Sequence, residues 1–170
     1  MILIAIGANL PDAAGRPPLI VCRAAAQALD GLLGLRLVAV SRWYRSPAWP
    51  EPADPAERQP DYVNGVARLA GTADPAALLA ALHGLEAAAG RVRGVANAAR
   101  PLDLDLIAMG PRGGLVRPAP APVLPHPRAH ERGFVLAPLL DVAPGFVHPV
   151  LHRSARTLMA ALPGARVSVI

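Results

Sequence analysis

The stretch RPLDLDLIAMG, from Arg100 to Gly110, decides the fold of this 170-residue chain. Leucines at positions 102, 104 and 106 alternate with Asp103 and Asp105. This period of two predicts a strand with one apolar face and one polar face. Aspartate is depleted in strands, so two aspartates on one strand face indicate a role beyond folding.

The segments around this strand follow a regular order of strands and helices. In chain order we expect a strand, a helix, two strands, a helix and the acidic strand, at Met1–Gly7, Pro18–Leu33, Leu35–Pro47, Tyr62–Gly71, Pro75–Gly90 and Arg100–Gly110. Asp74 suits an N-cap and Pro75 suits the first helical position. The order predicts a ferredoxin-like βαββαβ core, an α+β fold whose antiparallel sheet carries both helices on one face.

The remaining segments fit a single domain that spans residues 1–170. The chain is 53% apolar, which is enough for one genuine core, and its single cysteine, Cys22, excludes an internal disulfide. The proline-rich stretch 47–60 reads as a long surface loop. An apolar segment at 134–146 and a short helix at 154–162 are expected to cover part of the other sheet face.

The net charge of +5 comes entirely from arginine, because all seventeen basic residues are arginine and the chain has no lysine. This composition excludes a Schiff-base lysine and a P-loop lysine. Arginine, alanine and proline in excess are also what a GC-rich genome produces. The alternative is a polyanionic ligand, either nucleic acid or a nucleoside triphosphate, and net charge does not choose between these two.

Asp103 and Asp105 predict a magnesium–phosphate platform. Cα atoms two residues apart on a strand are about 6.5 to 7 Å apart, and their carboxylates repel unless a cation or bulk water separates them. Mg²⁺ takes one or two carboxylates together with substrate phosphates. Arginines nearby in the sequence, Arg91, Arg93, Arg100 and later Arg132, suit bidentate phosphate binding. A solvated strand face is the alternative.

Six motifs resemble those of the 6-hydroxymethyl-7,8-dihydropterin pyrophosphokinase family, in the same order. They are AIGANL (5–10), YRSPAW (44–49), PDYVN (60–64), EAAAGRVR (86–93), RPLDLDL (100–106) and PHPRAHERGFVLAPL (125–139). The resemblance covers roughly residues 1–149. It implies a three-layer αβα domain and the transfer of pyrophosphate from ATP to the hydroxymethyl group of the pterin, with release of AMP, in folate biosynthesis.

The resemblance also implies roles for individual residues. Asp103 and Asp105 would bind two Mg²⁺ ions, and Arg91 and Arg93 would act as catalytic-loop arginines. ATP would contact Glu86, Arg91, Arg93, Arg100, Leu106, His126 and Arg132. The pterin would contact Pro47, Trp49, Tyr62, Asn64 and Phe134, with the two aromatic rings of Tyr62 and Phe134 stacked on its faces.

Other functions remain open at the level of sequence. A ferredoxin-like RNA-binding module is one alternative, although it would have no use for two strand aspartates. A catalytically inactive relative of the family is another. We expect a cytoplasmic monomer with no nucleic-acid partner and no membrane contact, and we leave open an association with neighbouring enzymes of the folate pathway.

Overall fold

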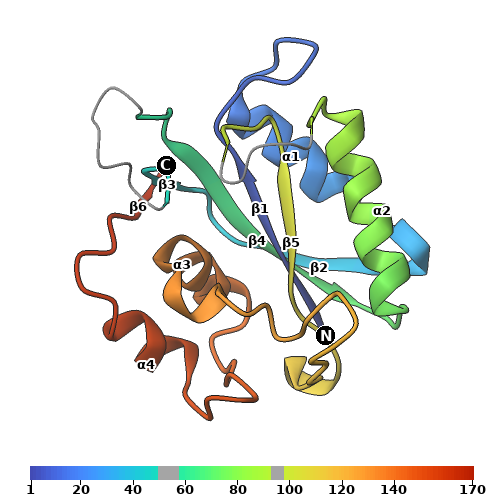
Figure 1. Ribbon diagram of the computed structural model, residues 1–170, viewed down its shortest axis with the longest axis vertical. Coiled ribbons are helices and arrows are strands. Elements are labelled where there is room, and N and C mark those ends of the chain that lie inside the picture. Colours follow the sequence, from blue (N-terminus) through green and yellow to red (C-terminus); the bar gives the residue numbers. More distant parts are fainter. Residues whose placement is uncertain (50–57, 93–97) are drawn as a thin grey trace.

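One antiparallel sheet organises the chain, and helices cover both of its faces (Figure 1). The computed structural model describes residues 1–49, 58–92 and 98–170. Within these ranges the strands are β1 (Ile2–Ala8), β2 (Arg36–Val40), β3 (Tyr44–Ser46), β4 (Tyr62–Ala70), β5 (Asp103–Ala108) and β6 (Ser168–Val169). The α-helices are α1 (Pro18–Ala28), α2 (Pro75–Ala88), α3 (Gly133–Val142) and α4 (Ala155–Ala160), and the 3-10 helices are η1 (Leu32–Gly34), η3 (Pro111–Gly113) and η4 (Ala129–Glu131).

The strand order confirms the predicted ferredoxin-like arrangement. The sheet runs β5-β1-β4-β3-β6, with β2 also paired to β4, and every pairing is antiparallel. The first strand of the chain therefore lies between β4 and the acidic strand β5. Because β5 is an edge strand, its outward backbone groups have no neighbouring strand to bond.

The alternation in the acidic strand is confirmed as well. Leu102, Leu104 and Leu106 are buried in a core cluster with residues of α1 and α2. Asp103 and Asp105 point to the opposite face, and their side chains are 27% and 33% exposed. The aspartates are thus partly buried, on a face of β5 that is polar at its start and becomes apolar core at Ile107.

A second core lies on the face that the aspartates share, so α1 and α2 cover one face and the C-terminal helices cover part of the other, as expected for a three-layer αβα domain. Residues of α3 and α4 pack there against Leu3, Val66 and Ile107. Side chains on this face of β1 shorten along the strand, from the fully buried Leu3 to the partly buried Ala5 and then to Gly7. The apolar packing therefore ends before the sheet does.

The predicted second strand, Leu35–Pro47, is divided into β2 and β3. Val40 pairs with Ala67 and Tyr44 with Asn64, so three residues of this strand, 41–43, lie opposite two residues of β4. Such an extra residue is a bulge, and it bends the strand. Ser41 accepts a hydrogen bond from the backbone of Val66 there. The break depends on a partner 25 residues away and has no local signal.

Three further differences concern helices and the C-terminus. α1 ends at Ala28, ahead of the predicted Leu33, because Gly31 turns the chain with a φ of +82°. The apolar segment 134–146 forms most of helix α3, which includes Pro138. β6 consists of only two residues, both exposed, and it nevertheless pairs with β3. Among the described residues, no helix combines the length and the apolar character needed to cross a membrane.

Candidate active site

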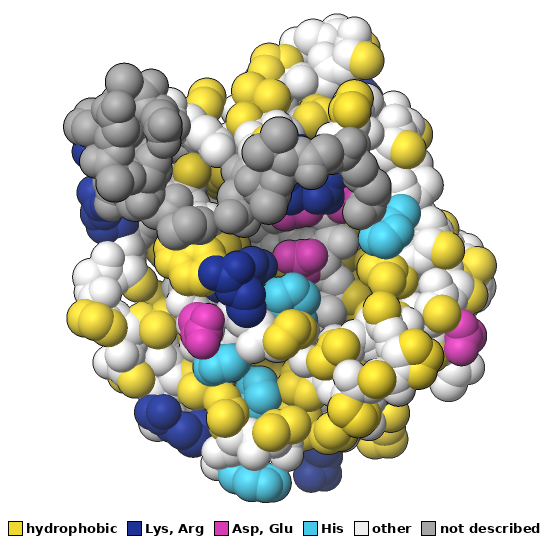
Figure 2. Space-filling model, viewed as in Figure 1, with side chains coloured by type: hydrophobic (Ala, Val, Ile, Leu, Met, Phe, Trp, Pro, Cys, Tyr) yellow, Lys and Arg dark blue, Asp and Glu magenta, His cyan; other side chains and the backbone are white. Residues whose placement is uncertain are grey.

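The site residues surround a position on β1, Gly7, that has no side chain. Gly7 lies between Asn64 on β4 and Asp103 on β5 in the register of the sheet. A Cβ on Gly7 would lie 3.4 Å from Asn64 Oδ1, 3.7 Å from Tyr62 Cδ1 and 3.9 Å from Asp103 Cβ. Figure 2 shows acidic, basic and histidine side chains gathered near the middle of this face of the molecule.

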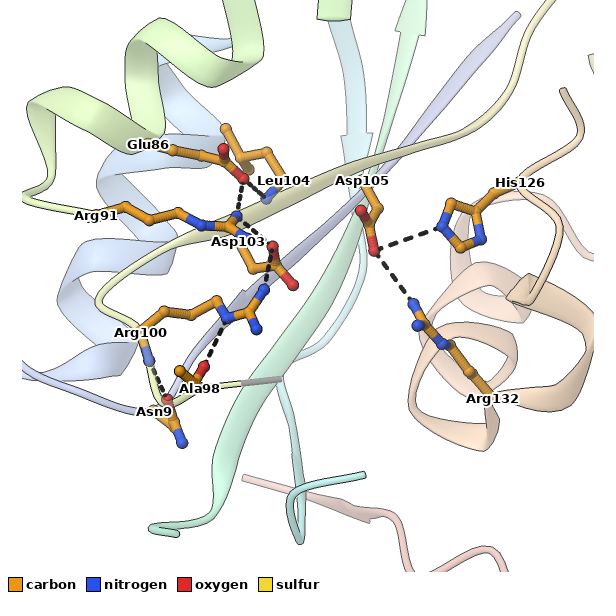
Figure 3. A network of polar contacts seen from close by, with 10 residues as sticks. All are labelled: Asn9, Glu86, Arg91, Ala98, Arg100, Asp103, Leu104, Asp105, His126 and Arg132. Carbon is orange, nitrogen blue, oxygen red and sulfur yellow. Dashed lines mark hydrogen bonds and ion pairs between the residues drawn. The ribbon is translucent and has the colours of Figure 1, made fainter. Parts of the chain in front are cut away.

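Asp103 is held by two arginines that belong to the segment before β5. Arg91 pairs with Asp103 Oδ1, and Arg100 Nη1 donates to the same oxygen at 3.2 Å (Figure 3). Burial opposes the charge of Arg100, but Asp103 and Tyr62 outweigh this effect, and the pKa of the guanidinium is raised. Both arginines are directed at the acidic strand.

Glu86 links helix α2 to the edge of the sheet. Its carboxylate is 2% exposed, accepts a hydrogen bond of 2.9 Å from the backbone N–H of Leu104, and pairs with Arg91. The N–H of Leu104 points out of the edge strand, where a buried donor without a partner would be costly. Arg91 thus lies between a carboxylate from the helix and Asp103 from the strand.

Asp105 faces a different segment, which comes from the second half of the chain. Arg132 Nη1 donates to Asp105 Oδ2 at 3.2 Å, and His126 Nε2 lies 3.9 Å from that oxygen. Burial lowers the pKa of His126, although Asp105 opposes the shift, and burial lowers the pKa of Arg132 as well. His126 Nδ1 accepts from the backbone N–H of Arg128, so the neutral ring carries its proton on Nε2, towards Asp105.

Asn9 joins three segments at the border of the site. Its side-chain oxygen accepts from the backbone N–H of Arg100 at 2.7 Å, and its amide nitrogen donates to Gln59 Oε1 and Pro60 O at 3.2 Å each. The side chain is 3% exposed. Asn9 therefore couples the end of β1 to the start of β4 and to the segment that carries Arg100.

The predicted pterin residues lie just after β3, on β4 and at the start of α3. Asn64 Nδ2 donates to Ser46 Oγ at 3.0 Å and to the carbonyl of Tyr62 at 3.4 Å. Because a carbonyl can only accept, these bonds fix the amide nitrogen and leave the side-chain oxygen, Oδ1, on the side of Gly7. Burial raises the pKa of Tyr62, partly offset by Arg100.

Trp49 brings the aromatic and basic residues of the site together. Its ring centroid lies 6.5 Å from that of Phe134, and the guanidinium carbons of Arg128 and Arg132 lie 4.3 Å and 5.3 Å from the Trp49 ring centroid. These are cation–π distances. Ser46, which precedes the predicted Pro47, supplies a direct contact to Asn64, whereas Pro47 itself contributes through its carbonyl, which accepts from Ser46.

Not every predicted residue joins this cluster. Leu106 is buried in the core on the opposite face of the sheet. Arg93 lies outside the described residues. Sequence reasoning missed Gly7, Asn9 and Ser46, all of which position other residues. The AIGANL and YRSPAW motifs contain them, but nothing in their residue types indicates the contacts they make.

The acidic pair fits a hard divalent cation that also binds substrate phosphates. Within the described part of the chain, the protein contacts of Asp103 go to Oδ1 and those of Asp105 go to Oδ2, and the second oxygen of each carboxylate takes no hydrogen bond. No cluster of three or more histidine, cysteine or acidic side chains able to hold a metal occurs among these residues. Mg²⁺ is commonly held by one or two carboxylates, with phosphates and water completing its shell.

Comparison with known proteins agrees with this chemistry. Residues 3–144 match the sequence profile of the family described as 7,8-dihydro-6-hydroxymethylpterin-pyrophosphokinase. A 2-amino-4-hydroxy-6-hydroxymethyldihydropteridine pyrophosphokinase of Pseudomonas aeruginosa is 38% identical over 162 residues, which is 95% of this chain and 91% of that protein. A protein of the same description from Haemophilus influenzae is 35% identical over 146 residues, or 86% of this chain and 83% of its own length.

Solved structures support the fold. The chain resembles the Plasmodium falciparum HPPK-DHPS triple mutant with a TM-score of 0.63 over 94% of its length, at 12% sequence identity. It spans 43% of that longer chain. At this identity the likeness concerns the arrangement of strands and helices.

Proposed function

The chain belongs to the 7,8-dihydro-6-hydroxymethylpterin-pyrophosphokinase family and is an ATP-dependent pyrophosphokinase of folate biosynthesis, and from this premise we propose how its residues divide the reaction. The enzyme transfers the pyrophosphoryl group of ATP to the hydroxymethyl group of 6-hydroxymethyl-7,8-dihydropterin and releases AMP. Enzymes of this family use ATP and typically need Mg²⁺. The roles of single residues and the number of metal ions are our proposal.

Asp103 and Asp105 are proposed to hold two Mg²⁺ ions through the carboxylate oxygens that face away from the arginines. Magnesium there would neutralise phosphate charge, align the reacting groups and lower the pKa of the attacking hydroxyl. The observation that carries the proposal is the pairing of each aspartate with a separate arginine system, Arg91 and Arg100 for Asp103 and Arg132 for Asp105. Without substrate, these arginines balance the carboxylate charges.

The arginines then have a second task when ATP is bound. Guanidinium groups bind phosphate oxygens bidentately and stabilise charge that develops during transfer. We propose that Arg100 and Arg132 hold the phosphates, while Arg91, anchored by Glu86 and Asp103, engages mainly in the transition state. His126 adds a neutral N–H donor beside Asp105. Positioning and electrostatics account for catalysis, and no described residue is assigned as a dedicated general base.

The pterin is proposed to occupy the space over Gly7. Asn64 Oδ1 is available there to accept from donors on the edge of the ring, because Ser46 holds the amide nitrogen. Tyr62 and Phe134 would stack on the ring faces, and Trp49 beside Phe134 would limit solvent access. Aromatic stacking contributes about 0.5–1.5 kcal/mol beyond the area that it buries.

The proposed partners follow from the same site. ATP and the pterin are the substrates, and we propose a monomeric enzyme that does not require nucleic acid. The fused HPPK-DHPS chain of Plasmodium falciparum supports the idea that neighbouring folate-pathway activities can be joined physically. An association of this chain with such an enzyme is a proposal of the same kind.

A test of the site uses Asp103→Asn and Asp105→Asn, which keep side-chain size and remove the charge. We expect AMP release to be lost at every Mg²⁺ concentration while circular dichroism remains that of the folded protein. Asp30→Asn is the control, because Asp30 is exposed and its hydrogen bond to the backbone of Leu37 needs only a side-chain oxygen. Near-normal AMP release by both site variants would refute the metal platform.

A further inference from the structure

Two histidines outside the site described above contact each other in the interior. The rings of His130 and His148 have centroids 5.5 Å apart and meet edge to face at 77°. His148 is 6% exposed. His130 Nδ1 and His148 Nε2 are both buried and have no hydrogen-bond partner among the described residues. Buried polar atoms without partners are uncommon, so their coincidence at one contact requires an explanation.

The hydrogen bonds of His148 fix its protonation. Its Nδ1 accepts from the backbone N–H groups of Val150 and Leu151, at 3.4 Å and 3.2 Å. A neutral imidazole with an acceptor at Nδ1 carries its proton on Nε2. Burial lowers the pKa of His148, and His130 adds to this effect. The Nε2–H of His148 is therefore a buried donor with no hydrogen-bond partner among the described residues, and the His130 ring packs against the ring that carries it.

His148 is itself rigidly placed in the segment between α3 and α4. Its backbone N–H donates to the carbonyl of Arg153, and its carbonyl accepts from His152, both at 2.9 Å. Val147 and Ser154 form an isolated β-bridge around it. The His148 ring is thus a fixed surface against which another element can be set.

His130 belongs to η4, which lies between His126 and Arg132, the two residues that face Asp105. It lies four positions after His126 and two before Arg132. The segment is tied to β5 at its start, where the N–H of His126 donates to Ile107 O at 2.9 Å, and it leads into α3 at its end. The ring contact between His130 and His148 connects η4 to the segment between α3 and α4. Among the described residues, it is the one ring-to-ring contact that makes this connection.

We propose that His148 is a positioning residue of the pyrophosphokinase, which sets His130 and thereby holds His126 and Arg132 in register with Asp105. This inference rests on the proposed roles of His126 and Arg132 at the phosphates. The contact acts mainly on ATP, because His126 and Arg132, which flank η4, face Asp105, whereas the pterin residues of β4 lie on another element. Displacements of about 1 Å at a catalytic group can cost up to about 100-fold in rate.

The test replaces the ring but keeps the turn. His148→Asn retains an acceptor for the backbone N–H groups of Val150 and Leu151 and loses the contact with His130. We expect kcat/KM for ATP to fall roughly tenfold, with a clearly smaller change in KM for the pterin, whose residues Trp49 and Phe134 also contact Arg132. His148→Gln, whose amide reaches the Nε2 position, should restore part of the loss. His152→Asn is the control, because His152 is exposed and has a φ of +52°, which asparagine tolerates.

A double-mutant cycle distinguishes coupling from general damage. If His148 acts through His130, His130→Asn should cause a similar loss, and the double variant should be little worse than either single variant. Additive losses, equal loss for both substrates, or normal kinetics in His148→Asn would overturn the proposal. If His148→Asn does not fold, the kinetics of His130→Asn, at a less buried position, decide by the same criteria.

Arg132→Ala separates this inference from the proposed function. A normal KM for ATP and a normal kcat in Arg132→Ala would show that the proposed phosphate role of Arg132 is wrong. A defective Arg132→Ala together with a normal His148→Asn would leave that role intact and reject the positioning role of His148.

Discussion

Glu86 allows two of its contacts to be separated by experiment. Its buried carboxylate accepts from the N–H of Leu104 on the edge strand and pairs with Arg91. Glu86→Gln keeps an oxygen for the Leu104 N–H and removes the negative charge. Glu86→Ala removes both. The difference between the two variants therefore measures the acceptor oxygen that Gln retains, which receives the N–H of Leu104 on the edge strand and faces Arg91.

The structure gives the expected magnitudes. A buried N–H left without an acceptor costs about 1–3 kcal/mol, and a hydrogen bond to a charged group contributes about 1.5–3 kcal/mol. Arg91 keeps Asp103 as a partner in both variants, so the cost of an isolated buried charge is not added. We expect Glu86→Ala to lower the free energy of unfolding by roughly 4 kcal/mol and Glu86→Gln by roughly 1 kcal/mol.

Urea unfolding followed by circular dichroism measures these values, with the melting temperature as a second readout. A domain of this size shifts by about 2–4 °C per kcal/mol, so Glu86→Ala should melt roughly 8–16 °C lower. Glu131→Gln, at a glutamate whose side chain is 53% exposed, should change little. Equal destabilisation by Gln and Ala at position 86 would refute the assigned role of the Leu104 N–H bond.

Three other predictions follow from burial and packing. Gly7→Ala should leave the melting temperature nearly unchanged, because its Cβ would meet Asn64 at an ordinary 3.4 Å, but calorimetry should show weaker pterin binding. Burial raises the pKa of the Cys22 thiol to about 12, so iodoacetamide should label it at pH 8 only after denaturation. Burial lowers the pKa of His148 in the folded protein below the value of about 6.5 that it has when unfolded. The free energy of unfolding should therefore be highest above a pH of about 6.5 and should fall as the pH drops from there towards the folded pKa. Unfolding experiments across this range should show the loss in the unsubstituted protein but not in His148→Asn.

The acidic strand was predictable because its information is local. Alternating leucine and aspartate specify which side chains enter the core, and the observed burial follows that pattern from Leu102 to Leu106. The same holds for the N-cap of α2, where Asp74 accepts from the N–H of Ala77 at 2.8 Å. Period and capping depend on neighbours within one or two turns, so the sequence alone is sufficient for them.

Features that depend on distant partners were not predictable in this way. The bulge between β2 and β3 requires Gly65, because the Trp43 ring occupies the space where a Cβ at position 65 would lie, 2.6 Å from the ring. Helix α3 forms around Pro138 because its apolar face packs on the sheet, although proline argues against a helix locally. Tertiary packing outweighs local propensity in both cases.

The site shows the same division. Asp103, Asp105 and the arginines carry charge in a recognisable spacing, and the structure brings Arg91, Arg100 and Arg132 to them. Asn9 and Ser46 act through single hydrogen bonds to residues far away in sequence. Nothing in an isolated asparagine or serine distinguishes such a role from that of an ordinary turn residue.

With the pterin at its proposed place over Gly7, the shortening of side chains along β1, from Leu3 through Ala5 to Gly7, would make the ligand a structural component of the enzyme. On this face the ligand would take the place that side chains fill further along the strand, so occupancy adds to the free energy of folding. A ligand present at 100 times its dissociation constant contributes about 2.7 kcal/mol. The lifetime of the protein against proteolysis should therefore rise with the supply of its own substrate, and mutations near Gly7 should be tolerated best when that supply is high.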